Sequence, residues 1–148
     1  MSIRYLTTCD NCKVPYSFET GSAYSLFFND DFHKSWISSF GNKSYRAKLS
    51  EFLNKNKDFF SPIDVRLYGC PKCHLIYNIE ILENFISNFE FHCKKCKKSL
   101  ICLNLKIVTK KGSEYIYFYD SNNTKFIGTC ENCKKELLGL VDGVMYID

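Results

Sequence analysis

Eight of the nine cysteines occur in four pairs, and every pair has the spacing Cys-X-X-Cys. The pairs are Cys9 and Cys12, Cys70 and Cys73, Cys93 and Cys96, and Cys130 and Cys133. Such a pair bends the chain into a tight knuckle whose backbone amides point at the sulfurs. Two facing knuckles place four thiolates at the corners of a tetrahedron around a zinc ion. The four knuckles therefore predict two zinc ions per chain, each held by four cysteines.

Four protein ligands leave no coordination position for water, which favours a structural zinc over a catalytic one. A thioredoxin-like redox site needs only one such pair, at the start of a helix. Iron–sulfur clusters use closer or asymmetric spacings, although an iron ion fits the same four-sulfur geometry. His74 and His92 flank cysteines and could replace one as a ligand, but four complete pairs favour cysteine alone. Cys102 has no partner at ligand spacing and is not expected to bind metal.

The gaps between successive knuckles are 57, 19 and 33 residues, and three pairings are compatible with them. Interleaved pairing is typical of RING-type modules, which carry a histidine among closely spaced middle ligands that this chain lacks. Nested pairing joins the second knuckle to the third and the first to the fourth. Sequential pairing joins the first to the second and the third to the fourth. We favour sequential pairing, because a small metal module usually joins its two knuckles through strands of its own.

The knuckles are of two kinds. The third and fourth both continue as Cys-Lys-Lys-X-Leu, whereas the first and second both run into an apolar strand that contains a tyrosine, Tyr16 or Tyr77.

Hydrophobic spacing predicts a helical insert at about residues 30–54. Its first helix carries apolar residues at i, i+4, i+5 and i+8, namely Phe32, Trp36, Ile37 and Phe40. Its second helix begins at Ser44 as a cap and carries Tyr45, Leu49, Phe52 and Leu53 on one face.

The rest of the chain favours β-structure. Strands are predicted at 14–20 and 23–28 around Gly21, at 63–67 and from residue 75 onward. Residues 101–108 alternate, so that one face is buried and Cys102 lies on the other. A hairpin turn is expected at 110–113, and Asp142-Gly143 is typical of a second hairpin within 137–147.

Two pairs of knuckles followed by strands resemble the zinc-ribbon superfamily across nearly the whole chain. Residues 9–80, with Cys70-Pro71-Lys72-Cys73, also resemble the CpXC family of small bacterial and archaeal proteins. These resemblances imply an α+β, β-rich double zinc ribbon. The first module would span 1–80 and contain the helical insert, and the second, mainly β, would span 81–148, with both packed as one unit. The resemblance to zinc ribbons implies that this chain is an accessory subunit of a nucleic-acid machine or an adaptor that docks on a larger protein.

The net charge and the hydropathy of the chain limit which kinds of partner it can bind. The formal charge is +4 with neutral cysteines, and eight metal-bound thiolates with two divalent zinc ions would bring it to zero. Any anion binding must therefore come from a local patch. No apolar stretch approaches the roughly twenty residues of a membrane helix, and no secretory signal is evident. We expect a soluble, cytoplasmic protein with reduced thiols.

Three functions are compatible with these features. We favour a non-catalytic adaptor that docks on a larger protein or nucleoprotein assembly. The alternative is direct binding of single-stranded RNA or DNA by a strand face of tyrosines flanked by lysines: Tyr115, Tyr117, Tyr119, Lys106, Lys110, Lys111 and Lys125. The tyrosines could instead pair across strands and cover their neighbours, which we favour. A metal-dependent or redox enzyme is the third alternative, but no catalytic motif is present and no small-molecule substrate is indicated.

Eight lysines lie in or within two residues of a knuckle: Lys13, Lys72, Lys94, Lys95, Lys97, Lys98, Lys134 and Lys135. They could bind phosphates, or they could offset the negative charge of zinc bound to four thiolates. We favour the second interpretation.

Overall fold

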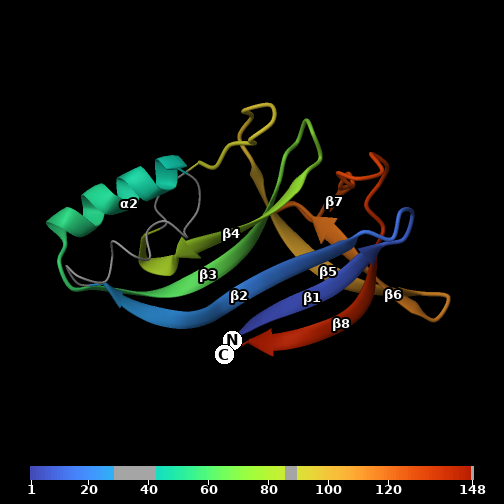
Figure 1. The fold of residues 1–148 in the computed structure, drawn as a ribbon, viewed down its shortest axis with the longest axis horizontal. Helices are drawn as coiled ribbons and strands as arrows, with labels where there is room; N and C mark the ends of the chain where they lie inside the picture. The colour runs from blue at the N-terminus through green and yellow to red at the C-terminus, as the bar shows by residue number, and fades with distance from the viewer. Residues whose placement is uncertain (29–42, 86–89, 148) are drawn as a thin grey trace.

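The computed structural model describes residues 1–28, 43–85 and 90–147, and of residues 23–28 only the backbone. The elements are β1 (Ser2–Cys9), β2 (Pro15–Phe28), α2 (Lys43–Lys55), β3 (Phe59–Gly69), β4 (Ile76–Leu82), the 3-10 turn η2 (Glu83–Phe85), β5 (Ile101–Lys110), β6 (Ser113–Tyr119), β7 (Lys125–Phe126) and β8 (Gly139–Ile147). Figure 1 shows a curved antiparallel sheet with α2 beside β3 and β4.

Six strands close into a barrel. The order is β2-β1-β8-β6-β5-β3, and a further pairing of β3 with β2 completes the ring. Strand β2 makes this closure possible because it changes partners at Gly21. Residues before Gly21 pair with β1, and residues after it pair with β3. The φ angle of Gly21 is 99°, in the region that favours glycine, and a Cβ there would lie 2.9 Å from the carbonyl oxygen of Met1.

The barrel corrects the expected α+β double zinc ribbon, which was wrong as a fold class. The described residues contain a single α-helix, and the two strands predicted on either side of Gly21 form one long strand, whose pairing with β3 shifts register between Ser22 and Ser25. Local periodicity identified most strands, but it carries no information about which distant strands pair. The strands β2 and β3 have 14 and 11 residues, so they extend beyond their knuckles and pair with each other.

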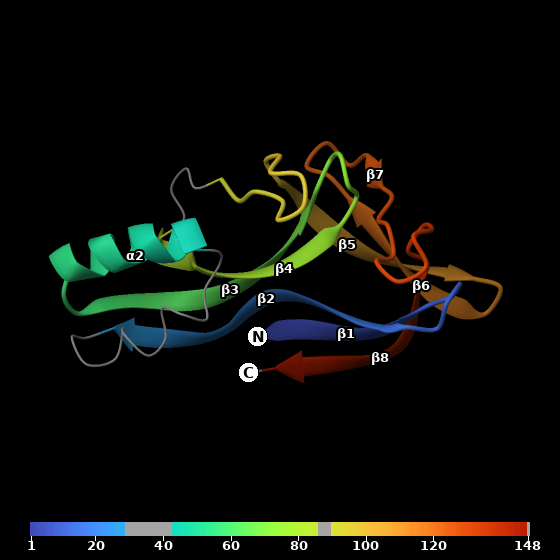
Figure 2. The ribbon, with the colours of Figure 1, turned by 45° about the horizontal axis from the view of Figure 1, so that its top comes forward.

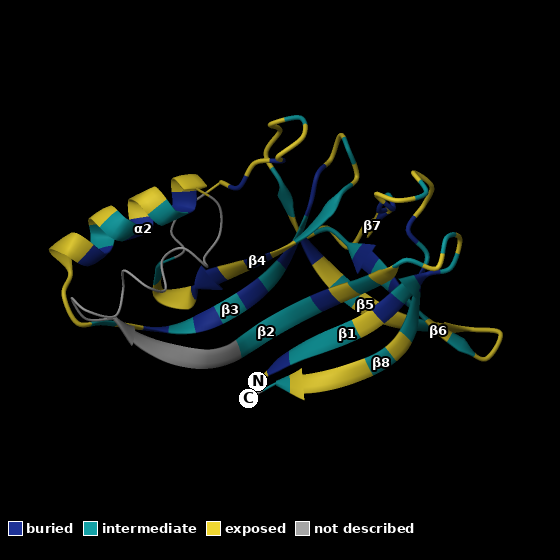
Figure 3. Cartoon of the chain, in the orientation of Figure 1, coloured by how far each residue is buried: buried dark blue, intermediate teal, exposed yellow. Residues whose placement is uncertain are grey.

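The helix α2 confirms the second half of the predicted insert. Tyr45, Leu49 and Leu53 are buried at intervals of one turn, and they pack with Ile63 and Ile81 of β3 and β4. The opposite side of the helix is exposed (Figure 3). The first predicted helix, with Phe32, Trp36, Ile37 and Phe40, lies outside the described residues.

A second core fills the barrel. Phe18, Leu67, Leu103, Ile116 and Phe118 are buried there, and this core reaches the cysteines Cys9 and Cys130. The predicted hairpin between β5 and β6 is confirmed, because Lys110 pairs with Ser113 across the turn. The predicted second hairpin is wrong: Asp142 and Gly143 lie within β8, which has an irregularity at this point where it pairs with β1.

The two ends of the described chain lie side by side, as Figures 1 and 2 show, because Ser2 pairs with Ile147. The division into modules 1–80 and 81–148 stays a prediction; the strand pairs β1–β8 and β3–β5 join residues from both sides of that boundary. In the described part of the chain, no helix has the length and apolar character needed to cross a membrane.

Candidate metal centres

The eight paired cysteines gather into two groups of four. We call Cys9, Cys12, Cys130 and Cys133 centre A, and Cys70, Cys73, Cys93 and Cys96 centre B; within each centre the sulfurs lie within 4.8 Å of one another. The first knuckle therefore meets the fourth, and the second meets the third. The favoured sequential pairing was wrong, and the nested alternative is the one that the chain adopts.

All four knuckles have the same backbone geometry. The carbonyl of the first cysteine of each pair accepts a hydrogen bond from the amide four residues later, as Cys9 does from Lys13. The amide of the same cysteine donates to the carbonyl five residues later. The residue after each second cysteine has a positive φ of 58° to 66°, at Lys13, His74, Lys97 and Lys134. This left-handed residue turns the chain back so that the two sulfurs of a pair point the same way.

The sulfur spacing fits a tetrahedral metal ion. With a zinc–sulfur distance of about 2.3 Å, tetrahedral sulfurs lie about 3.8 Å apart. Cys12 Sγ lies 3.6 Å from Cys130 Sγ, and Cys70 Sγ lies 3.4 Å from Cys96 Sγ. These distances are far above the 2.05 Å of a disulfide, and all nine cysteines are free thiols. The first cysteine of each pair is fully buried and the second is partly exposed, so both centres sit at the edge of the core.

Each centre has a tyrosine that contacts a sulfur from the opposite knuckle. Tyr16 Oη lies 3.1 Å from Cys130 Sγ and accepts a hydrogen bond from the Glu131 amide at 3.0 Å. At centre B, Tyr77 Oη lies in the equivalent position, 3.3 Å from Cys93 Sγ. Both tyrosines stand four residues after the second cysteine of their own knuckle. The sequence analysis missed this role, although it noted a tyrosine in each of these strands.

The pKa values within each centre diverge because four thiols share a small volume. Burial raises the pKa of Cys93, but the Tyr77 hydroxyl and two backbone amides outweigh it and lower the value to about 6. Burial likewise raises the pKa of Cys130, and the Cys133 amide and Tyr16 hydroxyl bring it down to about 6. The Cys96 sulfur and burial raise the pKa of Cys73 to about 12. The last ionisations in a centre, such as that of Cys73, therefore need a cation to offset them.

The two centres are copies of one three-stranded arrangement. In centre A, β1 enters the first knuckle and lies between β2, which leaves it, and β8, which leaves the fourth. In centre B, β3 enters the second knuckle and lies between β4 and β5 in the same way. The register at the knuckle is also the same, since Thr8 pairs with Pro15 and Gly69 with Ile76. Centre B and its strands are therefore nested within the sequence of centre A.

The centres also contact each other. The amide of Thr129, before the fourth knuckle, donates to the His74 carbonyl after the second knuckle at 2.8 Å. The Phe126 ring packs on Gly69, where a Cβ would lie 2.7 Å from a ring carbon. Gly69 therefore has no room for a side chain, and the strand entering centre B is fixed to the segment entering centre A.

The predicted tyrosine–lysine face lies on the outside of the barrel. Ile116 and Phe118 are buried, whereas Tyr115, Tyr117 and Tyr119 are half-buried on the opposite face of β6. Three lysines cover two of the rings: Lys106 Nζ lies 4.6 Å from the Tyr119 ring centre, and Lys125 and Lys110 lie 4.0 and 5.1 Å from that of Tyr117. Lys111 occupies the turn between β5 and β6.

The remaining metal-ligand alternatives lie outside both centres. His74 and His92 are adjacent to cysteines in sequence but belong to neither group of sulfurs. Cys102 faces outward on β5, opposite Tyr68, and is not part of a centre.

Comparison of the chain with models of protein families, with curated proteins and with solved structures gives no match. The cysteine centres are compatible with zinc-ribbon sites, and the resemblance to zinc ribbons and to the CpXC family rests on the cysteine motifs.

Proposed function

We propose that this chain is a non-catalytic zinc protein with two structural zinc ions, which docks on a larger protein or nucleoprotein assembly. The observation that carries the proposal is the pair of closed four-cysteine centres. Thiolate ligands and tetrahedral spacing favour zinc, and four protein ligands fill its preferred coordination. The ions would hold together strands from distant parts of the sequence, so their chemistry serves folding.

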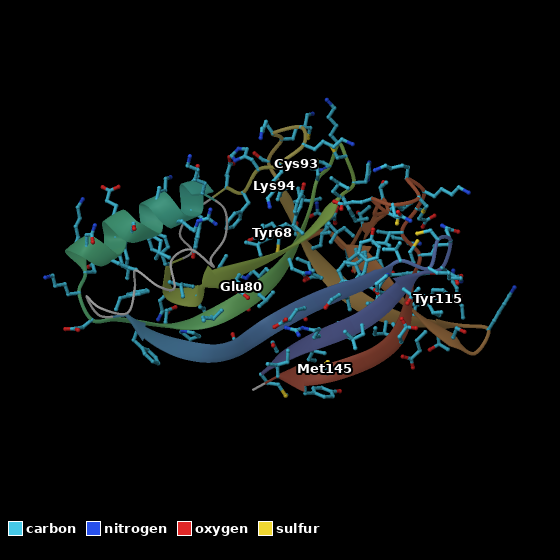
Figure 4. All side chains as sticks on the ribbon, in the orientation of Figure 1. Tyr68, Glu80, Cys93, Lys94, Tyr115 and Met145 are labelled. Atoms are coloured by element: carbon cyan, nitrogen blue, oxygen red, sulfur yellow. The ribbon has the colours of Figure 1, made fainter. Side chains whose placement is uncertain are left out.

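A strand edge supports docking. In the described residues, β8 pairs with β6 only at Gly139 and Leu140, while β1 lies along its other side. From Val141 to Ile147 no strand of the described ranges lies along the outer edge of β8, and this stretch carries the exposed side chains of Val144, Met145 and Tyr146. Figure 4 places Met145 on this outer strand.

An unpaired edge with apolar side chains and without lysine or proline pairs readily with another strand. The occupant that fits is an extended segment of a partner protein, whose backbone would bond to the β8 edge.

Affinity capture from the native host tests this docking. Tyr146 is 69% exposed, so Tyr146→Lys places a charge on the edge without disturbing a core, and Ile127→Lys changes an apolar residue of 49% exposure elsewhere. The proposal expects a protein retained by the unchanged chain and by Ile127→Lys, and lost from Tyr146→Lys at equal zinc content. Equal retention by all three, or by none, contradicts docking at this edge.

A second candidate function is direct binding of single-stranded RNA or DNA by the tyrosine–lysine face. The contacts of Lys125 and Lys110 with Tyr117 favour it, because they place cations beside half-buried aromatic rings as a strand of bases and phosphates requires. Fluorescence anisotropy with labelled RNA and DNA across a salt series tests it. Absence of binding at about 50 mM salt, or binding without a salt slope, contradicts this function.

A further inference from the structure

A basic pocket lies between centre B and the start of α2. Its volume is about 370 Å³, and five residues with basic side chains line it: Lys43, Arg46, His92, Lys94 and Lys97. The first two come from α2 and the others from the third knuckle and the residue before it. No acidic side chain lines the pocket among the described residues. Figure 4 shows Lys94 at the knuckle loop, on a different part of the molecule from Tyr115.

The two centres provide an internal comparison for the charge. The knuckles of centre A and the residues that follow them, 9–14 and 130–137, contain three lysines and three acidic residues. The equivalent residues of centre B, 70–75 and 93–100, contain five lysines and no acidic residue. Zinc with four thiolates forms the same dianion in both centres. Neutralisation of that dianion therefore does not account for the excess at centre B.

The high lysine content of the chain also does not explain the difference in charge between the two centres, because it would affect both centres equally. At centre A, Lys13 pairs with Asp10 at 3.0 Å. At centre B, the Lys97 ammonium donates to the Lys94 carbonyl at 3.1 Å, and it forms no ion pair with a carboxylate of the described residues. The nearest acidic residue in sequence, Glu90, lies 3.9 Å from the His92 ring and is 73% exposed.

The two knuckles of centre B carry more lysines than a single phosphate group can contact. Lys72 lies on the second knuckle, and Lys95 and Lys98 lie on the third; all three are exposed and do not line the pocket. The first turn of α2, which borders the pocket, contains no acidic residue to offset the helix dipole. A ligand with several phosphates in series fits this arrangement better than a small anion.

We propose that the pocket at centre B binds the phosphodiester backbone of a single-stranded nucleic acid. This goes beyond docking at β8 and is separate from the tyrosine–lysine face, because none of its residues belongs to either surface. The pocket supplies the ammonium groups of Lys43, Lys94 and Lys97 for one phosphate, and the neighbouring lysines contact the phosphates on either side. Contacts to phosphate carry no base selectivity.

The chain offers a matched control for the test. Lys97 and Lys134 both follow the second cysteine of their knuckle, and their φ angles are 66° and 62°. Lys97→Glu and Lys134→Glu therefore impose the same backbone strain and the same charge change next to a zinc centre. Only Lys97 lines the pocket.

The experiment is fluorescence anisotropy of the zinc-loaded protein with a labelled single-stranded oligouridylate, at several salt concentrations from about 50 mM upward. The proposal expects affinity that falls with salt. Lys97→Glu should weaken binding about tenfold at the lowest salt and reduce the slope of log affinity against log salt by about 1. Lys134→Glu should change affinity less than about twofold. Zinc content and thermal unfolding of both variants establish that they fold alike.

Equal weakening by the two variants, or by neither, overturns the proposal. Loss of binding with Tyr117→Leu and not with Lys97→Glu also overturns it and leaves the tyrosine–lysine face as the binding surface. Binding of inorganic pyrophosphate without binding of the oligonucleotide overturns the assignment to nucleic acid. Because docking at β8 is measured by protein capture and zinc by metal content, failure here is distinguishable from failure of the proposed function.

Discussion

The hydroxyl of Tyr16 lies 3.1 Å from the sulfur of Cys130, which belongs to the knuckle opposite its own. Tyr77 stands in the same relation to Cys93 at 3.3 Å. A phenol that donates to a metal-bound thiolate reduces the negative charge on that sulfur and fixes its direction. Tyr16 also accepts a hydrogen bond from the Glu131 amide, next to that cysteine, so one side chain joins the two knuckles of centre A.

Replacement of Tyr16 by phenylalanine should weaken zinc binding at centre A and leave centre B unchanged. The variant loses the bond to Cys130 and leaves the Glu131 amide without its acceptor. Such outer contacts typically alter metal affinity by about 10- to 100-fold. Competition with a chromophoric chelator should show one of two zinc ions released more easily. Tyr77→Phe should do the same at centre B.

The matched control is Tyr115→Phe, at a tyrosine on the outer face of β6 that belongs to neither centre. This variant should bind both ions as tightly as the unchanged chain. If Tyr16→Phe behaves like this control, the hydroxyl has no part in holding the metal.

The sequence contains a pattern that favours nested over sequential pairing of the knuckles. The first and second knuckles run into a strand with a tyrosine, and the third and fourth continue with two lysines. Each centre combines one knuckle of each kind, because the tyrosine of one must reach the first cysteine of the other. Sequential pairing would have joined the two knuckles with a tyrosine to each other and the two knuckles with lysines to each other. This rule still leaves the interleaved arrangement open, and only the strand pairing decides between the two.

The closed barrel could not be predicted from the sequence. Closure depends on Gly21, where β2 exchanges β1 for β3, and a glycine between two apolar runs is equally typical of a turn. The four Cys-X-X-Cys knuckles that form the two centres and the buried face of α2 were predictable because short-range spacing determines them. Strand β1 was not predicted: four of its residues, Arg4, Thr7, Thr8 and Ser2, are polar, and two of these are buried by pairing on both sides.

Tyr45 should make stability sensitive to alkaline pH. Burial raises its pKa to about 12, and its hydroxyl accepts the Leu82 amide at 2.9 Å. An unfolded tyrosine ionises near pH 10, so unfolding releases a proton between pH 10 and 12. The contribution of Tyr45 is therefore complete below pH 10 and declines as pH rises through 12.

Tyr45→Phe should be less stable by about 1–3 kcal/mol at pH 8, because the buried Leu82 amide loses its acceptor. This difference should shrink by about 1 kcal/mol at pH 11. Urea unfolding of both proteins at the two pH values measures it, and the other tyrosines cancel in the comparison. A difference that is constant or grows with pH would show that Tyr45 ionises normally.

Removal of metal should unfold the protein. Structural zinc binding contributes on the order of 10 to 16 kcal/mol in small modules, which exceeds the usual stability of a domain. Excess chelator should abolish the thermal transition and the strand signal in circular dichroism, and added zinc should restore both. A metal-free chain with an unchanged spectrum and melting temperature would contradict a folding role for the ions.

The most direct test of the two nested centres is native mass spectrometry of paired cysteine variants. The unchanged chain should carry two zinc ions. Cys12→Ser with Cys133→Ser damages centre A alone and should retain one zinc, whereas Cys12→Ser with Cys73→Ser damages both centres and should retain none. One zinc in the second variant and none in the first would mean that the knuckles pair sequentially, and would contradict the arrangement described for this chain.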